Sequence, residues 1–366
     1  MADANLIFAS PRRVKRSGME DKMQIYEKGN VIYGAFQKKG VEEMGKKGQE
    51  EKTLGQLIDD WNTNINYVRN TKTTWIYTTN IQKHLLNYYG GGFHLEQMTP
   101  KKIMEYMAYL KTEKKFSNNT VNKHRTHLMT LFEYMIVNDD IYGLSVNPVR
   151  KVKALKQEQY HHHIYQPEEA REILEELRNS GNIGLEVAVS IALYCGCRRE
   201  EVCALRWENV DMEKRIITIC EVRTTAGKEI VEMNHTKNNT VRQIGIPDAL
   251  YDVLERAKKY QKRYHRAFCS SNHNGMDFVL CEKDGAPWHP NNVTKRWSRF
   301  IKSKGFRYIR YHDLRHTNLS LLMTKMSAVD VAKLGGHKKV STTTNIYGHS
   351  FNNAVENGVK TMNELL

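Results

Sequence analysis

The C-terminal part of the chain reads HDLRHT at residues 312–317, LGGH at residues 334–337 and STTTNIYGH at residues 341–349. His312 and Arg315 are three residues apart, so on a helix they share one face, where a bound phosphate would meet both side chains. His337 follows a Gly-Gly pair that lets the backbone approach closely. Arginine supplies charge, histidine handles protons and Tyr347 offers a nucleophile, so this set can break and rejoin a phosphodiester without metal or nucleotide.

Phosphoryl transfer depends mainly on stabilising charge on the non-bridging oxygens. The sequence shows no P-loop and no cluster of paired carboxylates near these histidines. Two forked guanidinium groups could replace a metal, which predicts a second arginine elsewhere. Arg198, in CGCRREEVCALRW at residues 195–207, is the best candidate, and Glu201 could hold it or a neighbour in place. The alternative is that Arg198, Arg199 and Glu200 only begin a surface helix.

The order and spacing of these motifs resemble those of the tyrosine recombinases, also called phage-type integrases, over about residues 53–366. The sequence looks closest to the integrases of prophages and conjugative transposons. HDLRHT matches the second motif of that family letter for letter. The first motif (Gly-x-Arg-x-x-Glu) and the third (Gly-His, then Thr-Thr and Tyr) are matched by Gly196, Arg198, Glu201, Gly336, His337, Thr342, Thr343 and Tyr347.

The resemblance also implies a lysine on a β-hairpin, in a Thr-Lys pair followed by Arg and then Ile-Pro. Lys237 stands in that position, before Arg242, and would protonate the leaving 5′ oxygen. Lys228 is a rival on the same hairpin, and Lys237 could also be a solvated lysine without such a role. Gly335 departs from the pattern because Leu or Met usually precedes Gly-His, and we expect it to loosen the turn before His337. Cys195 and Cys197 replace the common threonine and leucine.

The reaction that the resemblance implies begins when Tyr347 attacks a scissile phosphate, forming a 3′-phosphotyrosyl link and releasing a 5′ hydroxyl. Arg198 and Arg315 would clamp the phosphate, His312 would assist proton transfer from Tyr347, and His337 would donate a hydrogen bond to the phosphate. The implied function is a site-specific DNA recombinase that integrates or excises a mobile element, with no cofactor and no metal. The alternatives are a relaxing enzyme like the type IB topoisomerases and an inactive DNA-binding accessory protein.

The fold class that we expect is mainly α with a small antiparallel β-sheet. Helical periodicity begins at Thr53, the three glycines at residues 90–92 end one helix, and Thr99-Pro100 opens another. Three β-rich runs begin at residues 215, 228 and 241, with a turn at residues 225–227, and FVLC at residues 278–281 would be a further short strand. The resemblance implies that the helical and catalytic domains form a clamp around DNA.

These patterns divide the chain into five segments. The expected segments are an N-terminal arm or small module (1–52), a helical core-type DNA-binding domain (53–147), a basic and extended linker (148–165), a catalytic domain (166–352) and a tail helix (353–366). The tail has one apolar stripe, which the family docks on a neighbouring protomer, although packing on its own domain is the alternative.

Composition points to nucleic acid as the partner. The formal net charge is +15 over 366 residues, which an acidic polymer explains better than an ordinary solvated surface. Basic residues expected to contact DNA are Lys123, Arg125, Lys151 and Lys153, for which a solvated helix face or linker is the alternative. Because recombination needs two cut duplexes, we expect a homo-oligomer on double-stranded recombination sites, a tetramer in synapsis, with an accessory DNA-bending or excision factor as a further partner.

Other features exclude some classes of protein. The sequence has no long apolar run and no secretory signal, so we expect a cytoplasmic, nucleoid-associated protein of bacterial or phage origin. Cys195, Cys197 and Cys203 lie in an apolar helical stretch without a CxxC pair, which indicates buried thiols rather than a zinc site. The run His161, His162 and His163 lies in a polar connector and is interpreted as a solvated linker.

Overall fold

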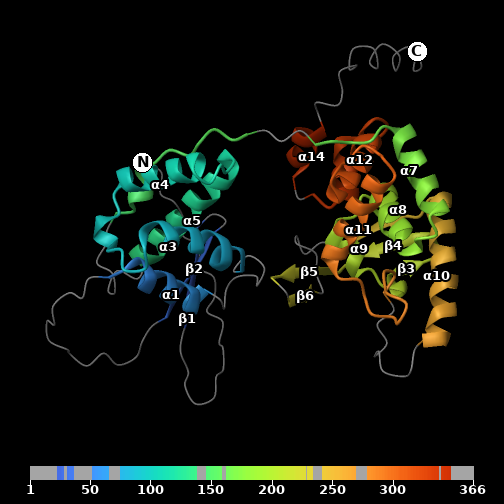
Figure 1. Ribbon diagram of the computed structural model, residues 1–366, viewed down its shortest axis with the longest axis horizontal. Helices are drawn as coiled ribbons and strands as arrows, with labels where there is room; N and C mark the ends of the chain where they lie inside the picture. Colours follow the sequence, from blue (N-terminus) through green and yellow to red (C-terminus); the bar gives the residue numbers. More distant parts are fainter. Residues whose placement is uncertain are drawn as a thin grey trace, which may run out of the picture. The chain divides into compact units, whose positions relative to one another are not determined.

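The computed structural model of the chain divides into two compact units, residues 1–160 and 161–366. Figure 1 shows its helices and strands. The structure describes the backbone of residues 23–28, 31–36, 52–65, 75–137, 146–158, 162–227, 229–233, 241–268, 278–337 and 339–347. The predicted class, mainly α with small antiparallel sheets, is confirmed. Among the described residues, no helix combines the length and apolar character needed to cross a membrane.

The first unit contains a strand pair followed by helices. Its strands β1 and β2 pair antiparallel, with Gly29 and Asn30 between them in the sequence. A two-residue Gly-Asn connection between alternating apolar runs favours a hairpin, a signal that our sequence analysis missed. The elements are β1 Met23–Lys28, β2 Val31–Phe36, α1 Leu54–Ile65, η1 Tyr77–Gln82, α3 Lys83–Tyr89, η2 Leu95–Gln97, α4 Pro100–Thr112, α5 Asn118–Val137 and η3 Pro148–Lys151.

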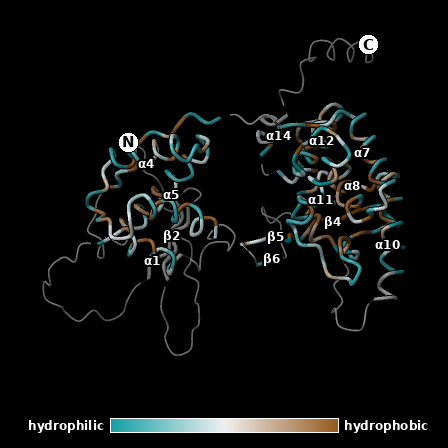
Figure 2. The backbone as a smooth tube through the Cα atoms, viewed as in Figure 1, coloured by the Kyte–Doolittle hydropathy of each residue, from teal (hydrophilic) through white to brown (hydrophobic). Residues whose placement is uncertain are grey.

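Two helix boundaries that the sequence predicts in the first unit are confirmed. Gly90, at a φ of 85°, follows the last residue of α3, and the Thr99 hydroxyl accepts a hydrogen bond from the Lys102 amide at the start of α4. The apolar faces of these helices enclose one core, around the fully buried Trp61. Figure 2 shows apolar segments, in brown, along the helices of this unit.

The beginning of the predicted linker is part of the first unit, which corrects our expectation of an extended, mainly polar segment. Val149 and Val152 are buried in the helical core. Asn122 on α5 both donates to the Leu155 carbonyl and accepts from the Leu155 amide. Val149 and Val152, three positions apart, could have indicated a buried turn, but the basic residues around them suggested a solvated segment.

The second unit is built around one apolar helix. Helix α8, Ile183–Cys195, is buried along almost its whole length and lies against α7, α10 and α12. The other elements are α7 Pro167–Asn179, α9 Arg199–Ala204, η4 Trp207–Asn209, β3 Val210–Asp211, β4 Ile216–Ile219, β5 Val222–Ala226, β6 Glu229–Met233, β7 Arg242–Gly245, α10 Asp248–Phe268, α11 Pro290–Ser303, α12 Tyr311–Met323, α13 Ala328–Gly335 and α14 Val340–Tyr347.

The β structure of the second unit forms two small antiparallel sheets, in the orders β3-β4-β7 and β5-β6. This arrangement differs from the prediction in two places. Thr225 and Ala226 belong to β5, so the turn follows them at Gly227. The FVLC run makes isolated bridges at Phe278 and Cys281 instead of a strand.

Candidate functional site

The predicted site residue Arg198 lies at the junction between α8 and α9. Gly196 ends α8 at a φ of 60°, and a Cβ added there would lie 2.5 Å from Asn318 Oδ1, so both conformation and space require glycine. Arg198 is then the N-cap residue of α9. Its side chain is 22% exposed, which is the state expected of a cation that must remain within reach of a ligand.

Glu201 holds Arg198 as predicted, and it also holds a second arginine. The Arg198 backbone amide donates to Glu201 Oε2 at 2.8 Å, and Arg198 Nη1 donates to Glu201 Oε1 at 2.8 Å. Arg242 donates to the same two oxygens, from Nη1 at 3.0 Å and from Nη2 at 2.6 Å. Burial alone would raise the pKa of Glu201, but Arg242, together with Arg198 and Arg315, lowers that pKa to about 2.

Replacing Glu201 with glutamine should destabilise the second unit. The Glu201 side chain is 1% exposed and the Arg242 side chain 7%, so the substitution leaves a buried guanidinium without a counter-charge. We expect Glu201→Gln to lower the free energy of unfolding by about 3 kcal/mol, measured by denaturant titration. Glu200→Gln is the matched control, because Glu200 is 24% exposed and pairs with Arg199 at the surface. Equal effects of the two substitutions would contradict this account.

Arg315 and His337 lie together beside this cluster. Arg315 is 1% exposed, donates from Nη1 to the Gly196 carbonyl at 2.6 Å, and donates from Nη2 to the Gly335 carbonyl. Its Nη2 also lies 2.9 Å from His337 Nε2. Since arginine can only donate, Nε2 accepts, and His337 Nδ1–H then donates to Thr343 Oγ1 at 2.8 Å. The desolvated ring, next to the cation of Arg315, has its pKa lowered to about 4 and is neutral.

The remaining predicted residues are placed to different extents. His312 lies in the first turn of α12, three residues before Arg315, and the residue as a whole is exposed. Desolvation, followed by the cation of Arg315, lowers the pKa of His312. Tyr347 is the last residue of α14, but its side chain is outside the described residues. Lys237 and Lys228 are also outside the described residues. The structure therefore brings Arg198, Glu201, Arg315 and His337 together.

Gly335 has a role other than the loosened turn that we expected. It is the buried last residue of α13, and its carbonyl accepts a hydrogen bond from Arg315. A Cβ added there would lie 3.2 Å from Arg315 Nη2 and 3.3 Å from the Leu319 side chain. The helix continues through Gly335, and the reversal occurs at Gly336, whose φ is 64°. Gly335 therefore gives the Arg315 guanidinium close access to the helix end.

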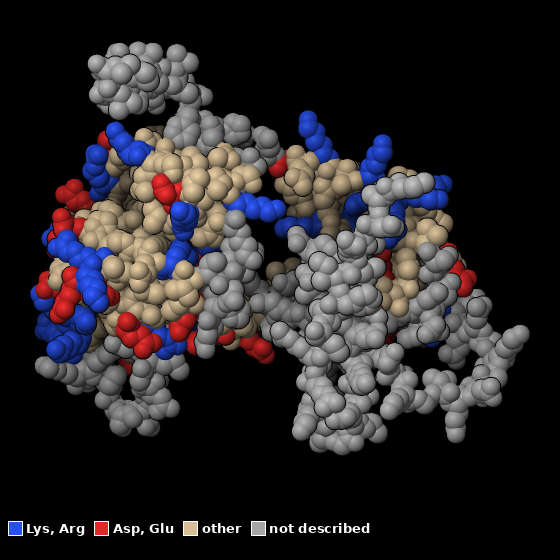
Figure 3. Space-filling view, turned by 180° about the vertical axis from the view of Figure 1, so that it is seen from behind, with Lys and Arg blue, Asp and Glu red and all other residues tan. Residues whose placement is uncertain are grey.

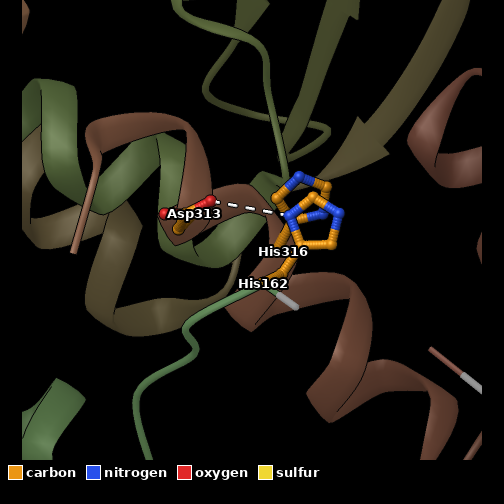
Figure 4. Close-up of side chains that lie close together, drawn as sticks. All are labelled: His162, Asp313 and His316. Carbon is orange, nitrogen blue, oxygen red and sulfur yellow. Dashed lines mark ion pairs between the residues drawn. The ribbon is translucent and has the colours of Figure 1, made fainter. Parts of the chain in front are cut away.

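His162 is packed rather than solvated, which corrects our interpretation of the histidine run. Its ring packs against that of His316, with centroids 3.7 Å apart, and its Nδ1 lies 3.7 Å from Asp313 Oδ1 (Figure 4). His162, Asp313 and His316 form a group of the composition that binds metals. However, the Arg310 guanidinium donates to both Asp313 oxygens, at 2.8 and 3.0 Å, and the two imidazole rings pack against each other with an interplanar angle of 32°. This geometry is that of a packed cluster.

The buried His316 should make the stability of the second unit depend on pH. Burial, followed by the nearby His162 and His312, lowers its pKa to about 2, far below the value of about 6.5 in an unfolded chain. The contribution of His316 to the free energy of unfolding is therefore complete above about pH 6.5. It decreases as the pH falls toward the pKa of His316 in the folded state. Lowering the pH from about 7.5 to about 5.5 should therefore reduce the free energy of unfolding by about 1.4 kcal/mol through this histidine.

Denaturant titrations of His316→Asn at both pH values test this expectation, since the variant should lose that part of the pH dependence. His163→Asn, at an exposed position on the same connector, is the control. An unchanged pH dependence in His316→Asn would show that the imidazole already titrates normally in the folded state.

The structure also describes the three cysteines and Arg125. Cys195, Cys197 and Cys203 are buried as predicted, and burial raises the pKa of the Cys197 thiol to about 12. Arg125 was expected to contact DNA, but its Nε donates to the Val152 carbonyl at 2.7 Å and its Nη2 to the Val149 carbonyl. Arg125 therefore holds the beginning of the linker against α5. Arg125 and Val152 are 27 positions apart, so the sequence pattern did not indicate this contact.

Comparisons with known proteins agree with this arrangement. The Phage integrase family model matches residues 164–354, and the model of the phage integrase N-terminal SAM-like domain matches residues 57–140. The ICEBs1 integrase of Bacillus subtilis is 25% identical over 302 residues, covering 82% of this chain and 78% of that protein. A XerC-like tyrosine recombinase of Caldanaerobacter subterraneus is 24% identical over 335 residues, covering 86% and 84%.

Among solved structures, the Tn1549 transposon integrase in complex with transposon right end DNA has a TM-score of 0.70 at 19% identity. The similarity covers 86% of this chain and 99% of that one, which establishes a shared fold.

Proposed function

Because the chain belongs to the phage integrase family of tyrosine site-specific recombinases, we propose that Tyr347 cuts DNA through a 3′-phosphotyrosyl intermediate and that the protein integrates or excises a mobile element. The observation that carries this proposal is the cluster of Arg198, Glu201, Arg315 and His337, assembled from segments far apart in the sequence. Arg198 Nη2 lies 3.3 Å from the Gly336 carbonyl, next to His337.

The proposed reaction needs no external energy source. The Tyr347 hydroxyl oxygen attacks phosphorus while its proton passes to the neutral His312, and the bond from phosphorus to the 5′ oxygen breaks. Lys237 gives a proton to that leaving oxygen. The phosphotyrosyl bond conserves the energy of the broken bond, so a 5′ hydroxyl of another strand can attack it and restore the phosphodiester. Arg198 stabilises charge on the non-bridging oxygens, where guanidinium binds bidentately.

Arg315 would act from a more enclosed position. Because it is 1% exposed and bound to the Gly196 and Gly335 carbonyls, direct contact with a phosphate would require movement at the Gly335–Gly336 end of α13. Without that movement, its buried charge still acts over a short distance in a weakly screening environment. In both cases the site concentrates positive charge around the phosphate without a metal ion.

The role of Lys237 can be separated from that of Lys228 by changing the leaving group. A 5′-thiolate leaves without a proton far more readily than an alkoxide, because a thiol is much more acidic than an alcohol. Lys237→Ala should slow cleavage of the ordinary substrate by about 100-fold or more and cleave a 5′-bridging phosphorothiolate substrate at nearly the normal rate. Lys228→Ala should cleave both at the normal rate, and the reverse pattern would assign the general acid to Lys228.

The DNA itself would be held partly by the basic residues of the first unit and the linker. Lys123, Lys151 and Lys153 are exposed and are candidates for contacts with phosphates, whereas the Arg125 guanidinium donates to the Val149 and Val152 carbonyls. On the face of the second unit shown in Figure 3, Lys and Arg are interleaved with Asp and Glu, so no single basic patch covers it. We propose double-stranded recombination sites as substrate, a tetramer in synapsis, and action in the cytoplasm at the nucleoid.

A recombination assay tests the function as a whole. A supercoiled plasmid carrying both end junctions of the mobile element should yield two recombinant circles. Relaxation without exchange between the sites would instead favour an enzyme like the type IB topoisomerases. Binding without any cleavage would favour an inactive accessory protein.

A further inference from the structure

Arg242 is a buried arginine that links three segments of the site. It begins β7, pairs with Ile219 of β4, and its side chain is 7% exposed. Its Nη1 and Nη2 both donate to the Glu201 carboxylate, and its Nε donates to the Leu334 carbonyl at 2.9 Å. Leu334 lies in the last turn of α13, three residues before His337. Arg242 therefore joins the beginning of α9 to the end of α13.

The position of Gly336 also depends on this guanidinium. A Cβ added at Gly336 would lie 3.1 Å from Arg242 Nη1, while the Gly336 carbonyl accepts from Arg198 Nη2. The two arginines thus contact the same glutamate and the same turn. Their contacts fix where Arg198 can place its guanidinium.

The charges show why a second arginine is needed. Glu201 Oε1 accepts from Arg198 Nη1 and from Arg242 Nη1, but Oε2 accepts a side-chain hydrogen bond only from Arg242 among the contacts described. If Glu201 had Arg198 as its only partner, the carboxylate would neutralise the cation that must act on the phosphate. Arg242 balances the charge of Glu201 instead. The group of Arg198, Arg242 and Glu201 therefore keeps a net positive charge.

A purely structural ion pair explains this arrangement less well. Buried ion pairs add little net stability, because desolvation offsets the attraction, and apolar side chains can often replace them. Here the buried pair lies against Arg198 and the segment that leads to His337. Arg242 also follows Lys237 by five residues in the sequence.

We propose that Arg242 is a positioning residue for strand cleavage. It holds Glu201 so that Glu201 orients Arg198 without cancelling its charge, and it fixes the end of α13 that carries His337. This inference depends on the proposed function, because it assigns Arg198 to the scissile phosphate.

The test compares a charged and a neutral scissile group. In a methylphosphonate, one non-bridging oxygen is replaced by a methyl group and the charge is absent. Arg242→Met should slow cleavage of the ordinary phosphodiester by about 100-fold, the usual effect of losing one preorganised charge-stabilising group, but slow cleavage of the methylphosphonate by about threefold or less. A role limited to folding would slow both reactions by the same factor.

A second variant keeps the test valid if Arg242→Met folds poorly. Arg242→Met combined with Glu201→Gln removes both buried charges, so it should fold better than Arg242→Met alone. It also removes the carboxylate that would neutralise Arg198. We therefore expect the double variant to cleave the phosphodiester about 10-fold faster than soluble Arg242→Met. Arg242→Lys should be intermediate, because an ammonium keeps the charge but not the fork geometry.

Arg256→Met is the matched control. Arg256 pairs with the buried Glu186, between α10 and α8, with Nη1 to Oε2 at 3.0 Å. Losing this pair should reduce stability but leave the ratio of the two cleavage rates unchanged. Equal losses on both substrates in Arg242→Met, with no recovery in the double variant, would overturn the positioning role while the proposed function stands. Failure of the unmodified protein to cleave either substrate would overturn both.

Discussion

Replacing Arg315 with alanine is expected to reduce strand cleavage by about 1,000-fold or more, the range seen when a charge-stabilising arginine is lost from phosphoryl transfer. The expected loss is large because Arg315 has two functions in the site. It supplies positive charge next to the proposed phosphate position. Its Nη2 also holds the His337 ring through the 2.9 Å hydrogen bond to Nε2. Single-turnover cleavage of a labelled site measures the effect without contributions from later strand exchange.

Arg315→Lys separates the charge from the geometry. A lysine keeps the charge, but its single ammonium cannot bind the Gly196 and Gly335 carbonyls in the planar geometry of a guanidinium. We therefore expect Arg315→Lys to remain impaired by about 100-fold. Arg171→Ala, at a 73% exposed position on α7, is the control and should cleave at the normal rate. Normal cleavage by Arg315→Lys would show that charge alone is sufficient.

Much of the fold follows from local sequence signals because the physical causes are local. Thr99-Pro100 caps α4, Gly90 ends α3, and Gly196 permits the turn that delivers Arg198. Each of these effects depends on backbone conformation within a few residues, so a sequence reveals it. The pairing of Arg198 with Glu201 is equally local, since Glu201 follows Arg198 by three positions at the start of one helix.

The contacts that sequence reasoning missed are between distant segments. Arg242 seemed only part of a hairpin motif, although it alternates with Ile244 and Ile246 on the buried face. An inward-facing arginine in an alternating strand predicts a buried carboxylate partner, but the pattern does not identify Glu201. His162 carried no such signal, because its packing against His316 depends on how the connector passes α12. Long-range packing decided both positions.

Tyr347 carries the largest predicted effect, since without a nucleophile no covalent intermediate can form. The tyrosine hydroxyl is the group that becomes bonded to phosphorus, and Tyr347→Phe removes that oxygen while keeping the aromatic ring. We expect the variant to lose cleavage completely and to retain binding to the recombination site. Tyr308→Phe is the control, because Tyr308 is 45% exposed and lies shortly before α12.

The most direct measurement uses a nicked suicide substrate. After cleavage, the short fragment that carries the released 5′ hydroxyl diffuses away, so the strand cannot be rejoined. We expect a denaturant-resistant protein–DNA complex with the unmodified protein and with Tyr308→Phe, and none with Tyr347→Phe. Protease digestion of the complex should leave the nucleotide on the peptide that contains Tyr347. An undiminished complex with Tyr347→Phe, or a nucleotide on another peptide, would contradict the assignment of the nucleophile.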